Sequence, residues 1–311
     1  MEDFINNKRN HHYISQAEQR LNALDEDPNT IYKFKKAGSL VVMVGEKAVG
    51  IRNNLSAKNL FTFSNSENGE NYNFEDIFSR YENNITLLNR TFNKKMSIND
   101  TNLDKEIYEI FSSKFMNIIR NPYFARLVVE IFSDLEKFIP SSEDINFINE
   151  KIMNFENNNK DLLCQTFGFS EENYKKWLRI IFFTLGLYKY ENGSTPIDYL
   201  IEQELLNTRN TIVKIDVYKY DNERCLISDR GFCELKVEHG FNLTFNIDKK
   251  CFASFTFVPG NGEPVDERES YFVVHENIID ELEKYNSACI EQSHEHVFCS
   301  RDQFLYSQEA L

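Results

Sequence analysis

The chain has 311 residues and a formal net charge of −14, because 35 lysines and arginines are outnumbered by 49 aspartates and glutamates. Hydrophobic residues make up 41% and aromatic residues 14% of the chain, which excludes an intrinsically disordered protein. With 11 glycines and 6 prolines, collagen-like and low-complexity classes are excluded too. The acidic balance excludes a sequence-blind coat on DNA, which requires a surplus of positive charge.

The N-terminal residues 1–9 carry charges and amides where a signal peptide needs an apolar stretch. The longest uncharged apolar run, residues 180–188, is far shorter than the roughly 20 residues of a membrane-spanning helix. We therefore expect a cytoplasmic protein without membrane association. In that compartment the six dispersed cysteines, none in a Cys-x-x-Cys pair, are expected to be reduced and buried.

The first hundred residues are expected to mix short strands with the start of a helical region. Residues 31–35 alternate as a strand does. After a turn at 37–39, residues 40–44 form a continuous apolar run typical of a buried strand. Apolar residues then recur at helical spacing from Phe74 to Phe92, which predicts one long helix.

The helical pattern continues beyond residue 100. An apolar stripe covers 103–119, and Asn121-Pro122 then starts a third helix that extends to Phe138, with asparagine as the cap and proline at the first helical position. Further helices are expected over 143–155, 170–188 and 196–208. The last has a marked start, because Thr195 precedes a proline and is followed three residues later by an aspartate.

After residue 210 the pattern changes to the two-residue period of strands. A first hairpin is expected from 213–217 and 224–228, and a second from 241–247 and 251–257. A helix over about 277–289 and a strand over 296–300 follow. The predicted fold is α+β in a single domain, 1–311, with a small N-terminal β region, a helical middle over about 74–208 and an antiparallel C-terminal sheet over about 211–300.

Two short motifs resemble parts of known binding sites. Gly45–Gly50 follows a predicted strand, but Ile51-Arg52 stands where a phosphate-binding loop needs Lys-Ser or Lys-Thr, so a strand–turn–strand is expected. His294 and His296 would share one face of a strand near Cys299 and are the candidate metal ligands. The alternative is a partly exposed strand end with the cysteine pointing inward.

The N-terminal segment contains the most unusual local motif, Asn10-His11-His12-Tyr13-Ile14-Ser15-Gln16. Imidazole titrates near neutral pH and serves as an acid, a base or a ligand. His12 is therefore a candidate catalytic residue, and Tyr13 and Gln16 are candidate binding residues; the alternative is a flexible polar N-terminus. Cys225 and Cys233 have no histidine at local spacing, so buried packing is expected for them rather than nucleophilic catalysis.

Several motifs, spread over nearly the whole chain, resemble a broad bacterial family, domain of unknown function 4238. His12–Gln16 followed by Leu21 resembles its His-Tyr-(Val/Ile)-Pro-Gln opening, although Ser15 replaces the proline. Arg120-Asn121-Pro122 resembles its Arg-Thr/Ser-Pro, and Leu226–Asp229 its Ile-Thr-Ser-Asp, although Arg230-Gly231 replaces the Asn-Pro that follows. The family has no assigned activity, so the resemblance implies a fold more than a function.

The resemblance also suggests which residues to combine: His12, Glu82, Arg120 and Asp229 are of types that protein cores seldom bury unpaired. In one cleft they would suit phosphodiester chemistry, since histidine moves protons, arginine holds phosphate, and carboxylates bind a divalent metal or orient the histidine. Two alternatives remain open. The residues form a buried structural network that ties the N-terminus to the core, or they never meet.

Two functions are expected from this combination. The first is an intracellular bacterial hydrolase directed at nucleic acid, a nuclease-like effector such as a toxin or a phage-defence protein. The second is a non-enzymatic interaction or sensor protein that binds a protein partner, which suits the acidic C-terminal two-thirds. A solvent-reachable, electropositive cleft favours the first, and dry, fully paired side chains with an exposed apolar patch elsewhere favour the second.

Overall fold

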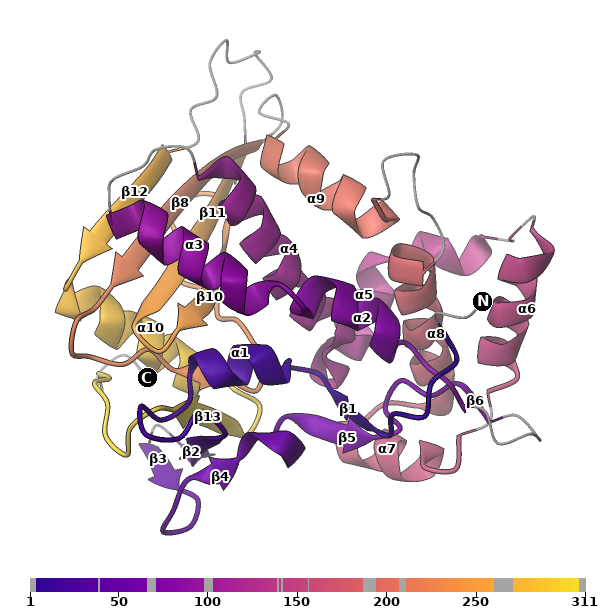
Figure 1. The fold of residues 1–311 in the computed structure, drawn as a ribbon. Coiled ribbons are helices and arrows are strands. Elements are labelled where there is room, and N and C mark those ends of the chain that lie inside the picture. The colour runs from indigo at the N-terminus through magenta and orange to yellow at the C-terminus, as the bar shows by residue number, and fades with distance from the viewer. Residues whose placement is uncertain are drawn as a thin grey trace. The chain divides into compact units, whose positions relative to one another are not determined.

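The computed structural model describes residues 4–38, 40–65, 71–97, 103–138, 140, 142–155, 157–186, 194–206, 211–259 and 271–307 (Figure 1). The fold is α+β, as the sequence predicts. Parts of three predicted elements, at Ser39, 187–188 and 207–208, lie outside the described residues.

The chain forms two compact units, each assembled from three separate stretches. Unit 1 comprises Met1–Tyr13, Leu55–Asn83 and Phe115–Ile201, and unit 2 comprises Ile14–Asn54, Asn84–Lys114 and Glu202–Leu311. The division does not follow the predicted helical middle and C-terminal sheet, because its boundaries fall inside helices α4 (Asp104–Arg120) and α9 (Pro196–Leu206). The single domain predicted over residues 1–311 is not tested by this division and stays a prediction.

Unit 1 is mainly helical. Two antiparallel strand pairs accompany the helices, β1 (Asn10–His12) with β5 (Ser56–Lys58) and β6 (Ser64–Asn65) with β7 (Asn71–Tyr72). Besides its parts of α4 and α9, its helical segments are α2 (Glu75–Glu82), η3 (Pro122–Phe124), α5 (Ala125–Ile131), η4 (Ser133–Lys137), α6 (Glu143–Met153), α7 (Lys160–Phe167), α8 (Glu171–Ile181) and a π-helical turn, η5 (Phe182–Gly186).

Local capping signals in unit 1 act as predicted. The Asn121 side chain accepts a hydrogen bond from the Tyr123 amide at 3.1 Å, and Pro122 begins the 3₁₀ turn η3. At α9, the Thr195 amide and hydroxyl both donate to the Asp198 carboxylate at 2.8 Å. The helix predicted to reach Phe138 is shorter, because α5 ends at Ile131 and a 3₁₀ segment follows.

The single helix predicted from Phe74 to Phe92 is wrong. Two helices occupy this region, α2 and α3 (Ile85–Ser97), and the turn between them falls at Asn83 and Asn84. Asparagine side chains compete with the helical backbone for hydrogen bonds, which favours a break at that point. The two helices belong to different units, so the apolar residues of this one sequence pattern pack in two separate cores.

Unit 2 contains a first sheet with the strand order β3–β2–β13–β9, whose members are β3 (Leu40–Met43), β2 (Thr30–Ala37), β13 (His296–Cys299) and β9 (Ile227–Ser228). All of these pairs are antiparallel, and β4 (Val49–Gly50) also pairs with β2. The strand–turn–strand expected around Gly45–Gly50 is therefore confirmed. The buried strand expected at 40–44 is wrong, because β3 lies at the sheet edge and leaves the Val42 side chain 59% exposed.

The second sheet of unit 2 has the order β10–β11–β8–β12, with β10 (Phe241–Asp248), β11 (Cys251–Pro259), β8 (Thr211–Lys219) and β12 (Tyr271–Glu276). The β10–β11 hairpin is confirmed. The first predicted hairpin is wrong, because the segment after β8 supplies only β9, which pairs with β13 instead. The sheet is not wholly antiparallel either, since β12 runs parallel to β8.

Unit 2 also contains the helices α1 (Gln16–Leu21), α3 and α10 (Ile279–Gln292), the first part of α4, the last part of α9 and the 3₁₀ turn η2 (Ile51–Asn53). The Phe111 ring of α4 packs edge-on against Phe245 and Phe255 of the second sheet, with centroids 5.7 and 4.9 Å apart. All six cysteines are described and free. Five are buried, as expected, whereas Cys164 is only partly buried; their reduced state stays a prediction. Within the described part of the chain, no helix is both long and apolar enough to cross a membrane.

Candidate functional site

An ion pair between Arg120 and Glu82 brings together two of the predicted site residues in unit 1. The Arg120 Nη1 donates to Glu82 Oε1, and its Nη2 donates to the Asn117 side-chain oxygen at 2.7 Å. The guanidinium lies over the Phe78 ring, 5.3 Å from the centroid. Arg120 is 2% exposed, whereas Glu82 is 27% exposed, so water reaches the pair only from the carboxylate side.

Local helix geometry explains how these groups meet. Glu75, Phe78 and Glu82 are three and seven residues apart on α2, so they share one face of that helix. Arg120 is the last residue of α4, and the backbone just before it is held because the indole of Trp177 donates to the Ile119 carbonyl at 2.8 Å. A contact that holds the adjacent backbone also restricts the position of the guanidinium.

The same face of α2 contains a second carboxyl group, Glu75, which was not predicted from the sequence. Burial raises the pKa of Glu75 to about 8; the positive charge of Arg120 opposes this shift, and the negative charge of Glu82 adds to it. Two carboxyl groups on one helix face therefore have different environments, one paired with arginine and one desolvated. The seven-residue spacing from Glu82 was the available signal.

The paired histidines have separate environments on β1. His11 is fully buried: its Nδ1 accepts from the Phe61 amide at 2.8 Å, and its Nε2 lies 2.9 Å from the Lys8 carbonyl. Its ring stacks on Phe61, and Phe61 contacts Phe78, the ring beneath Arg120. Burial lowers the pKa of His11 to about 4, so it is a neutral core histidine at physiological pH.

His12 is also buried, opposite Ser56 in the β1–β5 register, so a flexible polar N-terminus is not what the chain forms there. Adjacent residues on a strand point to opposite faces, so the ring of His12 leaves β1 on the side opposite to His11. His11, not His12, is therefore the histidine whose ring stacks on the aromatic residues beside Arg120.

The two candidate binding residues lie in different units. Tyr13 is buried in unit 1, where its ring packs edge-on against Tyr123 and Phe167 at 5.9 and 6.2 Å. Gln16 opens α1 in unit 2 and accepts a hydrogen bond from Arg20 at 2.9 Å. Tyr13 therefore acts in aromatic packing, and Gln16 makes a contact within its own helix.

Asp229 belongs to unit 2 and is 1% exposed. Its two carboxylate oxygens accept three backbone N–H groups, from His294 at 2.8 Å, Glu295 at 2.7 Å and His296 at 2.8 Å. This arrangement fixes the turn that leads into β13. The carboxylate oxygens are therefore engaged by the backbone, as expected of a structural aspartate.

The metal and nucleophile candidates lack suitable geometry. Across the described ranges, no group of three or more histidine, cysteine, aspartate or glutamate residues is placed to hold a metal ion, so His294, His296 and Cys299 do not form one. Burial lowers the pKa of His296. Burial raises the pKa of the Cys225 and Cys233 thiols well above their usual range, which disfavours the thiolate that a nucleophile requires.

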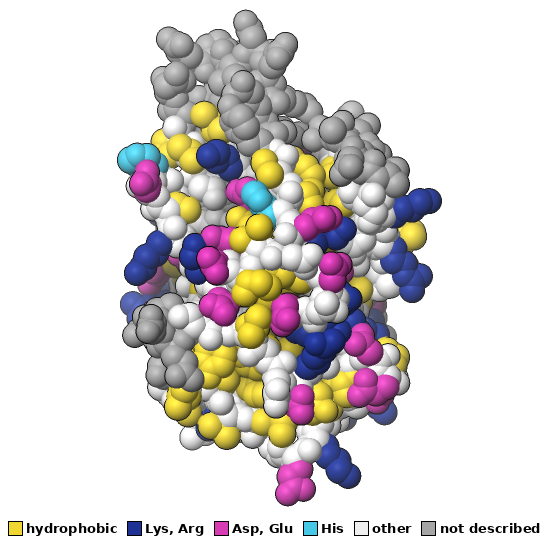
Figure 2. All heavy atoms as spheres, turned by 90° about the vertical axis from the view of Figure 1, so that its left-hand side faces the viewer, with side chains coloured by type: hydrophobic (Ala, Val, Ile, Leu, Met, Phe, Trp, Pro, Cys, Tyr) yellow, Lys and Arg dark blue, Asp and Glu magenta, His cyan; other side chains and the backbone are white. Residues whose placement is uncertain are grey.

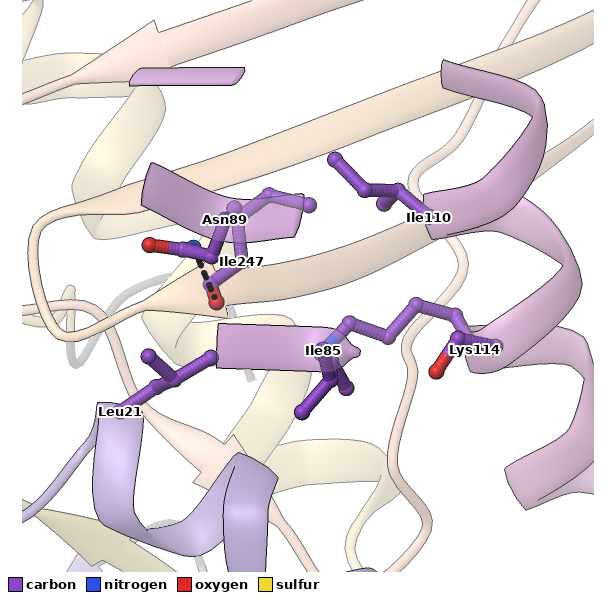
Figure 3. A pocket seen from close by; sticks show the side chains of 7 residues that line it. Leu21, Ile85, Asn89, Ile110, Lys114 and Ile247 are labelled. Atoms are coloured by element: carbon purple, nitrogen blue, oxygen red, sulfur yellow. Dashed lines mark hydrogen bonds between the residues drawn. The ribbon is translucent and has the colours of Figure 1, made fainter. Parts of the chain in front are cut away.

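A small hollow in unit 2 is lined by Leu21, Ile85, Asn89, Ile110, Ser113, Lys114 and Ile247 (Figure 3). It has room for about one water molecule. Lys114 forms a buried ion pair with Glu18, and the Asn89 amide donates to the Ile247 carbonyl at 3.2 Å. The hollow is too small for a substrate, and its Lys114 and Asn89 side chains already have partners.

In comparisons with known proteins, the chain matches no protein-family model, no curated protein and no solved structure.

Proposed function

We propose that the protein is a hydrolase of nucleic-acid phosphodiester bonds in which Glu75 donates the proton to the leaving oxygen. One observation carries this proposal: the pKa of Glu75 is raised to about 8, so the carboxyl keeps its proton at neutral pH. A general acid works best when its pKa lies near the working pH. Enzymes with two carboxyl groups often separate their pKa values in this way.

The geometry assigns other roles to the surrounding residues. Arg120 is buried, and both of its terminal nitrogens already donate to protein groups, so it holds Glu82 rather than a phosphate. Lys8 is the solvent-facing cation of this cluster: its side chain is half exposed, and its ammonium lies 2.9 Å from Asp76 on the first turn of α2. We assign phosphate attraction to Lys8, while the proton-shuttle role of His12 stays a prediction.

The test uses the purified full chain with labelled single-stranded RNA, single-stranded DNA and duplex DNA, each with Mg²⁺ or with EDTA. We expect Glu75→Gln to reduce cleavage by about 100-fold or more, because the amide cannot donate the required proton. Glu130→Gln is the control, since its carboxylate is exposed on α5 and pairs with the exposed Arg126, so this variant should retain most activity. Wild-type protein that cleaves none of these substrates, or a fully active Glu75→Gln variant, contradicts the proposal.

A second candidate function is strand addition by a protein partner. Two observations favour it: Arg120 is buried and paired within the protein, and the edge of β3 is exposed. Leu40 and Val42 are 47% and 59% exposed on the outermost strand of the first sheet of unit 2. A partner strand can pair with such an edge through backbone hydrogen bonds and cover its apolar side chains. A partner captured by the wild type but not by Val42→Lys supports this function; equal capture contradicts it.

A further inference from the structure

A second group of polar side chains lies on the sheet β10–β11–β8–β12 of unit 2. In the parallel β8–β12 register, Val273 lies beside Asp216 and His275 beside Tyr218. Residues two apart on a strand share a face. Asp216, Tyr218 and His275 therefore project from the same face of the sheet.

The imidazole of His275 is held by two contacts. Its Nε2 lies 2.8 Å from Asp216 Oδ1, and its ring stacks on Tyr218 with centroids 4.6 Å apart and planes inclined by 17°. A carboxylate can only accept a hydrogen bond, so Nε2 carries a proton, and in the neutral ring Nδ1 then keeps its lone pair. Among the described residues, the His275 ring forms no other hydrogen bond.

The stack continues into the core, which gives the site a rigid base. Tyr218 stacks on Phe252 at 4.7 Å, and Phe252 stacks on Tyr285 at 4.2 Å. Catalytic side chains need such support to hold their orientation. The stacked rings restrict the plane of the imidazole.

The site is reachable from solvent, since the side chains of His275 and Asp216 are 31% and 33% exposed. The face shown in Figure 2 carries histidine side chains together with acidic, basic and hydrophobic ones. Burial raises the pKa of Tyr218 to about 12, and the nearby charges of Asp216 and Glu281 add to the shift. The phenol therefore stays protonated and can donate a hydrogen bond at neutral pH.

We propose that Asp216, His275 and Tyr218 form a second hydrolytic site, which acts on uncharged carboxylic esters. His275 is the general base, Asp216 orients it, and Tyr218 donates a hydrogen bond to the oxygen that gains charge. These are the three roles that an ester-hydrolysing site needs when water is the nucleophile. The acidic groups Asp216 and Glu281 disfavour an anionic substrate, which separates this activity from phosphodiester cleavage.

The step balances with water alone. His275 Nδ1 takes a proton from water as the water oxygen forms a bond to the ester carbonyl carbon, and the carbonyl electron pair moves to its oxygen. Collapse of this intermediate breaks the bond to the alcohol oxygen. That oxygen takes the proton back from the imidazolium, which leaves a carboxylic acid, an alcohol and neutral His275.

The test measures p-nitrophenyl acetate hydrolysis by the purified chain. We expect His275→Gln to lower the rate above background at least tenfold, Asp216→Asn to lower it by a similar factor because the tautomer is no longer fixed, and Tyr218→Phe to lower it several-fold. His239→Gln is the control, since His239 is an exposed histidine of the same unit and should leave the rate unchanged.

A second measurement keeps the proposal falsifiable if a variant folds poorly. Diethyl pyrocarbonate modification of the wild type, followed residue by residue by mass spectrometry, should label His275 at least as fast as His239. The proposal is overturned if His275 resists the reagent, or if folded His275→Gln and His239→Gln hydrolyse the ester equally fast.

Discussion

Removing Arg120 or Glu82 from their ion pair should lower the free energy of unfolding by unequal amounts. Glu82→Gln leaves a guanidinium that is 2% exposed without its counter-ion, whereas Arg120→Met leaves a carboxylate that water already reaches over 27% of its surface. Isolating a buried charge costs about 3–5 kcal/mol. Because the Gln oxygen can still accept one hydrogen bond, we expect Glu82→Gln to cost about 2–4 kcal/mol.

Arg120→Met should cost less. It forfeits the hydrogen bond to Asn117 and the contact over Phe78, together about 1–2 kcal/mol, while the flexible methionine fills much of the vacated volume. In the double variant neither charge is left alone, so its loss of stability should be smaller than the sum of the two single losses.

The assay is urea unfolding followed by tryptophan fluorescence, since the only tryptophan, Trp177, donates to the backbone next to Arg120. Glu130→Gln is the matched control: its ion pair with Arg126 is highly exposed on α5, so its effect should stay below about 0.5 kcal/mol. The reasoning is refuted if Arg120→Met costs more than Glu82→Gln, or if the two effects simply add.

Three further changes have defined outcomes. Glu75 has a pKa of about 8 in the folded chain against an ordinary 4.5, so between these values only the folded state holds the proton, and stability should fall as pH rises. In urea titrations at several pH values, Glu75→Gln should flatten this dependence of stability on pH. His11 has the opposite effect on the pH dependence of stability: its pKa is lowered from 6.5 to about 4, so stability is lost as pH falls between these values. His11→Asn should therefore make the free energy of unfolding less sensitive to acid. Asp229→Asn should lower stability by about 2–3 kcal/mol, since an amide replaces charge-assisted acceptors of three backbone N–H groups, whereas exposed Asp134→Asn should change it little.

Features encoded within a few residues could be predicted from the sequence. The Thr195–Asp198 cap, the Asn121-Pro122 helix start and the β10–β11 hairpin each depend on neighbours no more than 16 positions away. Their hydrogen-bonding partners are already adjacent in the chain, so little else competes with them.

Features that depend on distant partners could not be predicted. Nothing near Asp229 shows that its carboxylate accepts from the backbone 65 residues later, and nothing in β9 shows that it pairs with β13 rather than β8. The contact of Arg120 with Glu82 fits the buried network that the sequence left open as an alternative, because a buried charge needs a partner. The pKa of Glu75 was missed because it arises from burial, which no local pattern records.

The position of β13 has a consequence for folding during synthesis of the chain. This strand lies between β2 and β9, so residues made near the start of translation wait for residues 296–299 before their sheet is complete. Until then one side of β2 presents unpaired backbone groups to other nascent chains. A ribosome that stalls before residue 296 should therefore leave a product prone to aggregation, and chaperone demand should be greatest late in elongation.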